Sequence, residues 1–149
     1  MITVRHPLMR IYSAWHDKFL KNGRWVGYIK DNFGIYLAQL EQRDMTNDLY
    51  QYSFEAFVEL LALSKGDFIR DRHWTSIRSY CGTCTLDYDF ITRQETADTD
   101  QSFLLKLLGM ESLHVPDKYT ESLSIEQIAA PYANVSRSVL ENVYANYFP

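Results

Sequence analysis

Apolar residues recur at helical spacing between Leu8 and Leu20, and this is the clearest pattern in the chain. The residues that share one face of such a helix are Leu8, Ile11, Tyr12, Trp15 and Phe19. The opposite face carries Arg10, Ser13 and Asp17, and Asn22-Gly23 follows as an end signal. The pattern predicts an amphipathic helix over residues 8–20, entered from the end of a strand at Val4.

Further elements follow from similar signals. Ser53 is typical of a helix N-cap, and the buried face behind it consists of Phe54, Phe57, Val58 and Leu61, with Lys65-Gly66 at the end. Leu86–Thr92 has a strand pattern that leads to Thr96 or Asp98 as the next N-cap. The helix after it presents Phe103, Leu104, Leu107 and Leu108 and ends at Gly109.

The remaining segments complete a mixed order of strands and helices. We expect short helices between Trp25 and Tyr52, and two helices from Ser122 to Tyr147 that separate near Pro131. No repeat or linker divides the chain, so residues 1–149 form a single domain. The order favours an α/β fold in which helices cover a parallel sheet.

Composition, net charge and cysteine number exclude several classes of protein. The 149 residues are 46% hydrophobic with a formal net charge of -4, which favours one compact core and argues against a nucleic-acid partner. No apolar run approaches the roughly 20 residues that cross a bilayer. The only cysteines are Cys81 and Cys84, too few for a disulfide-rich scaffold.

The segment from Val4 to Phe19 joins a strand to a helix through Pro7, with Arg5 at the junction. Free N–H groups at a helix N-terminus, together with an adjacent arginine, make a phosphate site. The sequence pattern Arg-x-Pro followed by Arg-x-x-Ser-Ala resembles the 3′-phosphate motif of Golgi carbohydrate sulfotransferases. Taken alone, the same residues also fit an ordinary amphipathic helix with proline at its first position and a solvated arginine.

A second block, between Arg72 and Asp100, is similar to the chondroitin/dermatan 4-O-sulfotransferase type of that family. The matching residues are His73-Trp74, Cys81, Cys84, Tyr88-Asp89-Phe90-Ile91, Arg93 and Glu95-Thr96. The departures are Gly82-Thr83 between the cysteines and Thr92-Arg93 where the family usually has Gly-Lys. The C-terminal VLENVYANYFP also resembles the end of the family's domain, so three blocks occur in the family's order.

The resemblance implies a P-loop-like sulfotransferase fold and the donor 3′-phosphoadenosine 5′-phosphosulfate, with no metal. Arg5 and Ser13 would hold the 3′-phosphate, and the acceptor would be a glycan hydroxyl on a proteoglycan-type hexosamine. The family's lysine-bearing loop for the 5′-phosphosulfate precedes this motif and is absent here. We therefore expect a partial domain, truncated at the N-terminus and slightly at the C-terminus, from a Golgi parent whose membrane anchor this chain lacks. The alternative is an inactive remnant that only binds nucleotide or glycan.

Single residues keep competing interpretations. His73 is the candidate general base, because histidine titrates near neutrality, or a structural histidine beside Trp74. Tyr88 is a candidate for stacking on adenine, or a half-buried strand tyrosine. Cys81 and Cys84 favour a disulfide or paired structural thiols over a zinc site, which would lack a fourth ligand, or a redox pair. Asn134-Val135-Ser136 is a glycosylation sequon for a lumenal chain.

Overall fold

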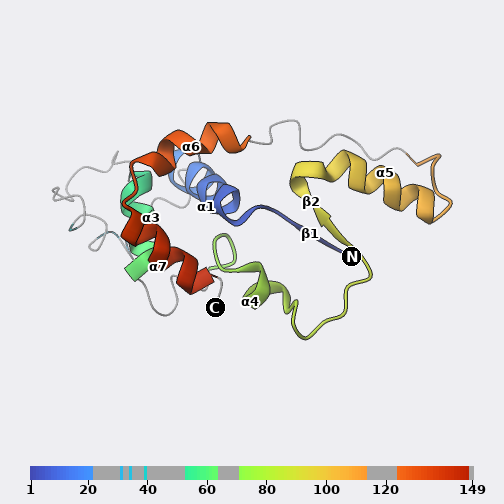
Figure 1. Ribbon diagram of the computed structural model, residues 1–149, viewed down its shortest axis with the longest axis horizontal. Coiled ribbons are helices and arrows are strands. Elements are labelled where there is room, and N and C mark those ends of the chain that lie inside the picture. Colours follow the sequence, from blue (N-terminus) through green and yellow to red (C-terminus); the bar gives the residue numbers. More distant parts are fainter. Residues whose placement is uncertain are drawn as a thin grey trace.

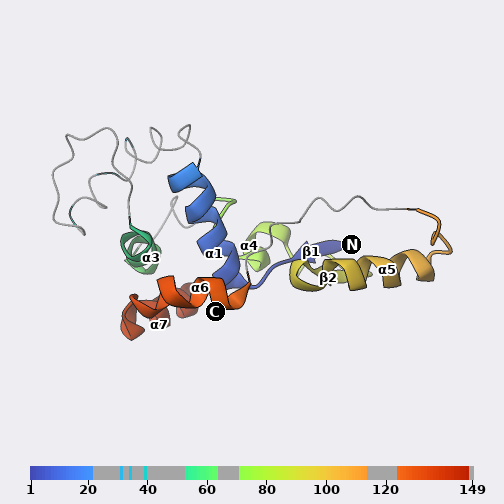
Figure 2. The same cartoon turned by 90° about the horizontal axis from the view of Figure 1, so that it is seen from above.

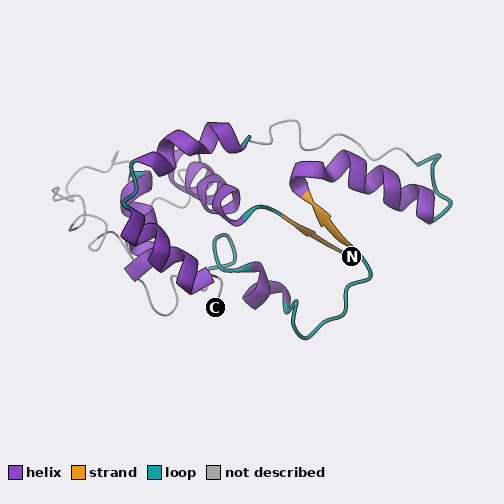
Figure 3. Cartoon of the chain, in the orientation of Figure 1, coloured by secondary structure: helices purple, strands orange, loops and turns teal. Residues whose placement is uncertain are grey.

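The computed structural model describes residues 1–21, 31, 34, 39, 53–63, 71–113 and 124–147. Two parts are visible along its length (Figure 1): a group of helices and a small sheet with one helix beside it. Figure 3 shows that helix dominates, with two strands in the described part of the chain. The predicted mixture of helices and a parallel sheet is therefore confirmed, although the sheet is small.

The sheet pairs two strands from distant parts of the chain. Strand β1 (Ile2–Val4) lies parallel to β2 (Ile91–Arg93), with Ile2 opposite Ile91 and Val4 opposite Arg93. The hydroxyls of Thr3 and Thr92 lie 2.9 Å apart across the pair. Because the strands are parallel, their carboxyl ends meet at one edge of the sheet.

Each strand is followed by a helix at that edge. Helix α1 (Pro7–Trp15) follows β1, and a π-helical segment η1 (His16–Lys21) continues it. A 3-10 turn η2 (Gln94–Thr96) and helix α5 (Ala97–Leu107) follow β2. The predicted helix over residues 8–20 is thus present, with its hydrogen-bond pattern changing at His16. Its predicted end at Asn22-Gly23 lies outside the described residues.

The helical group buries the core. Helix α1 packs with α3 (Phe54–Leu63) and α6 (Ile125–Ala133), and α3 packs with α7 (Arg137–Tyr147), in the helical group of Figures 1 and 2. The most deeply buried side chains are Ile11, Phe57, Val58, Leu61 and Trp74. A short helix α4 (Ile77–Cys81) follows the loop that carries Trp74. Ile11 of α1 and Trp74 of this loop belong to the same buried cluster, so the core holds the N-terminal helix and the loop together.

Two predicted helix ends are confirmed. The hydroxyl of Ser53 accepts a hydrogen bond from the N–H of Ala56 at 3.1 Å, as expected of an N-cap. Gly109 has φ +66°, and its N–H and that of Met110 donate to the carbonyls of Lys106 and Leu105. This is a Schellman end for α5, which a glycine accommodates because it has no Cβ.

Two predictions about the second half of the chain are wrong in part, and a third, the separation of two helices near Pro131, is confirmed. The strand over residues 86–92 is limited to Ile91–Arg93, because β1 offers only three partner residues. Phe103, Leu107 and Leu108 do not form a buried face but are more than half exposed, and no side chain of α5 is buried. Helix α6 runs through Pro131, and the break before α7 falls at residues 134–136.

Three further predictions concern the N-cap at Thr96, the helices between Trp25 and Tyr52, and the helix end at Lys65-Gly66. Thr96 occupies the N-cap position of α5, but its hydroxyl donates to Asp100 and does not cap the helix. Of the segment between Trp25 and Tyr52, only residues 31, 34 and 39 are described, and all three are helical. The predicted helix end at Lys65-Gly66 lies outside the described residues.

Candidate functional site

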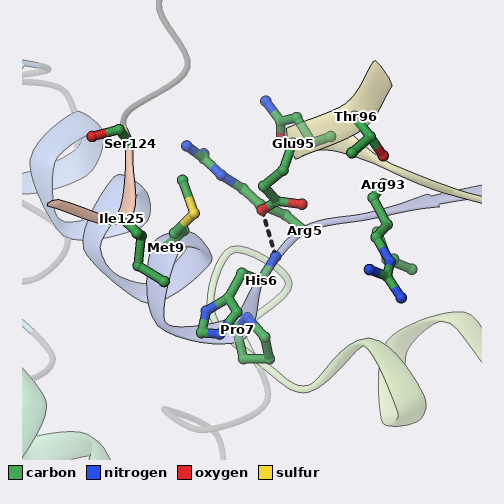
Figure 4. A pocket seen from close by; sticks show the side chains of 11 residues that line it. Arg5, His6, Pro7, Met9, Arg93, Glu95, Thr96, Ser124 and Ile125 are labelled. Atoms are coloured by element: carbon green, nitrogen blue, oxygen red, sulfur yellow. Dashed lines mark hydrogen bonds between the residues drawn. The ribbon is translucent and has the colours of Figure 1, made fainter. Parts of the chain in front are cut away.

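The two strand-to-helix junctions meet at the carboxyl edge of the sheet. The backbone N–H of His6, at the start of α1, donates to Glu95 Oε1 of η2 at 2.7 Å (Figure 4). No side chain caps the first turn of α1, and Pro7 stands at its first position. In open sheets of α/β proteins, ligands bind outside the carboxyl ends of the strands. The junctions therefore place the candidate site between β1, α1 and η2.

Arg5 lies at the centre of this region and lines three cavities around the junction. Its side chain is half-buried, and its Nε atom is buried without a hydrogen-bond partner. Burial lowers the pKa of the Arg5 guanidinium, and the nearby Glu95 carboxylate acts in the opposite direction. A buried donor without a partner is costly in a folded protein, so this arginine is suited to an anionic ligand.

One of these cavities, of about 520 Å³, also contains Ser13 and His73. Arg5, Arg10 and Lys18 supply positive charge to its lining, and Asp17 is the one acidic residue among the described lining residues. Lys18 Nζ lies 2.5 Å from Asp17 Oδ2. The structure thus brings together Arg5, Ser13 and His73, three of the residues that the sequence nominated.

Arg10 of α1 binds the loop that carries His73, residues 71–76, through hydrogen bonds. One terminal nitrogen of its guanidinium donates to the carbonyl of Thr75, and the other donates to the carbonyl of Arg72 at 2.6 Å. Burial lowers the pKa of Arg10. The sequence pattern puts Arg10 on the polar face of the first helix without indicating a role, because no local pattern shows which distant carbonyls an arginine reaches.

His73 is oriented by Asp71. The Nδ1 atom of His73 lies 2.7 Å from Asp71 Oδ1, which also accepts the backbone N–H of His73 at 2.8 Å. A carboxylate on Nδ1–H favours the tautomer in which Nε2 carries the lone pair. The neighbouring Trp74 is fully buried. Asp71 was not identified from the sequence, although an acidic residue two positions before a candidate histidine is a detectable signal.

A second cavity, of about 640 Å³, lies on the Glu95 side of the junction (Figure 4). Arg5, Met9, Arg93 and Ile125 are among its lining residues. Figure 4 shows the side chain of Arg5 running beside Glu95, whose carboxylate bonds to His6. Glu95 therefore partly neutralises the site and connects η2 to the start of α1.

Tyr88 and the cysteines lie apart from these cavities. The Tyr88 hydroxyl donates to the carbonyl of Cys81 at 2.6 Å, and Tyr88 is not among the described residues that line the three cavities around Arg5. Its predicted contact with adenine stays a prediction. Cys81 and Cys84 are both free thiols, so of the two favoured alternatives the disulfide is not present in this structure.

The described part of the chain has neither a cluster of metal ligands nor a membrane-spanning helix. No three side chains among His, Cys, Asp and Glu there come close enough to hold a metal ion. None of the helices there has the length and apolar character to span a bilayer. Asn134 of the sequon is exposed at the end of α6.

Comparison with known proteins gives a family for this fold and site. The profile of the sulfotransferase family matches residues 1–149. The chain therefore belongs to the sulfotransferase family. No solved structure matches it.

Curated relatives share the same region. Carbohydrate sulfotransferase 10 of Danio rerio is 26% identical over 157 residues, which covers 97% of this chain and 43% of the relative. Carbohydrate sulfotransferase 12 of Mus musculus is 29% identical, covering 97% of this chain and 36% of the relative. Human carbohydrate sulfotransferase 10 is 30% identical over 118 residues, or 74% of this chain and 32% of the relative. The chain thus spans less than half the length of these relatives.

Proposed function

We propose that this chain belongs to a carbohydrate sulfotransferase and binds the 3′-phosphate end of 3′-phosphoadenosine 5′-phosphosulfate at the β1–α1 junction. The single observation that carries the proposal is the buried, unpartnered Nε of Arg5 in a cation-rich cavity that also contains Ser13. The family and the names of the relatives support sulfotransfer to a carbohydrate. The finer assignments, a proteoglycan-type hexosamine as acceptor and a Golgi location for the parent, rest on the resemblance of the motifs.

The residues present fit a phosphate ester. Arg5 offers a planar guanidinium that donates to two phosphate oxygens at once, and the Ser13 hydroxyl donates a further hydrogen bond. The uncapped first turn of α1 adds N–H groups and the positive end of the helix dipole. Burial already removes part of the water around the Arg5 guanidinium before a phosphate binds.

In the proposed reaction, His73 is the general base. The new bond forms between the glycan oxygen and sulfur, while the bond between sulfur and the 5′-phosphate oxygen breaks. The electron pair leaves with adenosine 3′,5′-bisphosphate, and the proton of the glycan hydroxyl passes to Nε2 of His73. Asp71 holds His73 through Nδ1 and stabilises the imidazolium that forms, which makes Asp71 a positioning residue.

The His73→Gln variant tests this role. Loss of a positioned general base lowers the transfer rate by about 10²- to 10⁴-fold. We expect that loss in transfer of labelled sulfate from the donor to a hexosamine-containing glycan, with the affinity for adenosine 3′,5′-bisphosphate unchanged. Asp71→Asn should lower the rate less than His73→Gln does, because it changes only the orientation of His73.

Two outcomes would count against this mechanism. Transfer by His73→Gln at the wild-type rate would make His73 a structural residue beside Trp74. Binding of the bisphosphate by the wild-type chain without any sulfate transfer would favour the alternative function, that of a protein that binds nucleotide or glycan only.

Glu95 provides a second, smaller prediction about the donor site. Its carboxylate acts on Arg5 and lies where a dianionic phosphate would approach. Glu95→Gln keeps an oxygen that accepts the His6 N–H but removes the negative charge. We expect binding of adenosine 3′,5′-bisphosphate to tighten by about threefold at low salt, and the gain to fade as salt screens it. Weaker binding in a titration series over salt would show that Glu95 supports the site.

A further inference from the structure

The loop that carries His73 is a tight turn built around Asp71. The backbone N–H groups of Trp74 and Thr75 both donate to the carbonyl of Asp71, at 3.1 and 2.7 Å. The N–H of His73 donates to the carboxylate of the same residue at 2.8 Å. Three successive N–H groups are therefore satisfied within the loop, and its carbonyls are the backbone groups that another element can hold.

A single side chain from α1 holds the carbonyls before and after His73. One terminal nitrogen of Arg10 donates to the carbonyl of Arg72 at 2.6 Å, and the other donates to the carbonyl of Thr75. These residues lie 62 and 65 positions from Arg10 in the sequence, and Figure 1 shows the loop before α4 beside α1. A guanidinium suits this geometry because its nitrogens form a rigid, planar fork.

The charge of Arg10 acts on the same loop. Burial lowers the pKa of Arg10, and the attraction of several nearby groups, the Asp71 carboxylate among them, acts in the opposite direction. The same carboxylate lies 2.7 Å from Nδ1 of His73. The guanidinium therefore acts on His73 through the backbone of the loop and through the residue that orients its ring.

Arg10 differs from Arg5 in the use of its donors, although both line the cavity that contains Ser13. Each terminal nitrogen of Arg10 donates to a loop carbonyl, whereas Nε of Arg5 is buried without a partner among the described residues. The arginine with an unused donor for a phosphate is therefore Arg5. The donors of Arg10 are directed at the loop.

We propose that Arg10 is a positioning residue for the transfer reaction: by holding the loop on both sides of His73, its guanidinium keeps the imidazole where it accepts the proton. The inference rests on the proposed function, because it concerns the base of that reaction. In this arrangement Arg10 touches neither the glycan oxygen nor the sulfur. Its loss should therefore lower turnover and not the affinity for the nucleotide.

The Arg10→Met variant separates these two effects. Methionine fills part of the buried space and donates no hydrogen bond. A displacement of about 1 Å at a catalytic group lowers the rate about 10²-fold. We expect kcat for sulfate transfer to a hexosamine-containing glycan to fall by about that factor. The Kd of adenosine 3′,5′-bisphosphate should rise by less than about threefold, because only one screened charge is lost.

The matched control is Arg137→Met. The side chain of Arg137 is 92% exposed on α7 and paired with Glu141, so its removal takes the same charge from a place outside the site. Neither kcat nor the Kd of the bisphosphate should change in this variant.

Amide hydrogen exchange, followed by two-dimensional NMR, measures the loop without reliance on turnover. The N–H groups of Trp74 and Thr75 report on the turn directly, because both donate to Asp71. In Arg10→Met they should exchange at least about tenfold faster than in the wild type. The amides of α5, which belongs to the other part of the molecule in Figure 1, should exchange at the wild-type rate.

Arg10→Lys is the conservative variant, and it carries the test if Arg10→Met does not fold. Lysine keeps the charge, but its single ammonium does not reproduce the planar fork. We expect a kcat about tenfold below that of the wild type, an unchanged Kd for the bisphosphate, and intermediate exchange at Trp74 and Thr75.

Three results would overturn the proposal. Wild-type exchange at Trp74 and Thr75 in both variants would show that Arg10 does not hold the loop. Faster exchange with an unchanged kcat would show that the hold is purely structural. A Kd for the bisphosphate raised about 100-fold with kcat unchanged would make Arg10 a phosphate ligand.

Failure of the proposed function gives a different pattern. Wild-type transfer by His73→Gln, together with faster exchange in Arg10→Met, would overturn the role of His73 as base but not the contact between Arg10 and the loop. Loss of bisphosphate binding by the wild-type chain would overturn the donor site and leave the exchange result as the measure of that contact.

Discussion

Replacing Arg5 with alanine should lower the affinity for adenosine 3′,5′-bisphosphate by about 100-fold. A guanidinium that makes two charge-assisted hydrogen bonds to a phosphate contributes about 2 to 3 kcal/mol, which corresponds to that factor. The effect is expected to be large because Arg5 lines all three of the cavities described above and its Nε has no partner among the described residues. Equilibrium dialysis with labelled bisphosphate measures it.

The controls for this variant use other arginine changes. Arg137→Ala removes an arginine whose side chain is 92% exposed on α7 and paired with Glu141, and it should bind as the wild type does. Arg5→Lys keeps the charge but not the planar pair of donors, so its affinity should be intermediate. Wild-type affinity in Arg5→Ala would reduce Arg5 to the solvated arginine of an ordinary amphipathic helix.

The largest effect on stability is expected for Trp74→Ala. Trp74 is fully buried, and its ring lies 5.4 Å from that of Phe57 in an edge-to-face arrangement and 6.4 Å from that of Phe19. Truncation of such a side chain costs about 3 to 5 kcal/mol in the free energy of unfolding. Urea denaturation followed by far-UV circular dichroism measures the loss.

Trp74 also determines where His73 lies. Because Trp74 is anchored between the helices, the loop from Asp71 to Thr75 is held against α1. There the Arg10 guanidinium donates hydrogen bonds to the carbonyls of Arg72 and Thr75. Trp74→Phe retains an aromatic ring and should cost less than the alanine variant. A loss below about 1 kcal/mol for Trp74→Ala would contradict this anchoring role, since a well-packed core site loses more.

Local signals in the sequence predicted the elements that depend on neighbouring residues. The strand–proline–helix unit around Arg5, the cap at Ser53 and the end at Gly109 each follow from side chains within a few positions. Their physical causes are local as well: a fixed proline φ, a hydroxyl that reaches an N–H three residues on, and a glycine with positive φ.

Errors arose where the outcome depends on distant partners. The apolar residues of α5 predicted a buried face, yet Phe103 is 63% exposed because no described element covers it. Residues 86–90 have a strand pattern, but among the described residues no strand lies opposite them, since β1 is three residues long. The separation of the last two helices was predicted near Pro131, and it lies just after it, because α6 ends at Ala133. Sequence periodicity does not say which faces find a partner.

In the candidate site, too, local sequence signals predicted some residues, and contacts between distant residues determined the others. The motif around Arg5 and Ser13 predicted an anion site, and the structure places both residues in one cavity. His73 lies in the same cavity because Arg10 donates hydrogen bonds to the loop that carries it. The contact between His73 and Asp71 is known only from the structure. The positioning role proposed for Arg10 could not be predicted from the sequence, because the carbonyls that it binds lie 62 and 65 positions away.

The central claim is that the β1–α1 junction recognises a 3′-phosphate. Calorimetric titration of the folded wild-type chain with adenosine 3′,5′-bisphosphate and, separately, with 5′-AMP tests it most directly, because the two ligands differ only in that group. The account predicts at least about tenfold tighter binding of the bisphosphate, with the preference declining as salt increases. Equal affinity for the two ligands, or no binding of either by the folded chain, would contradict it.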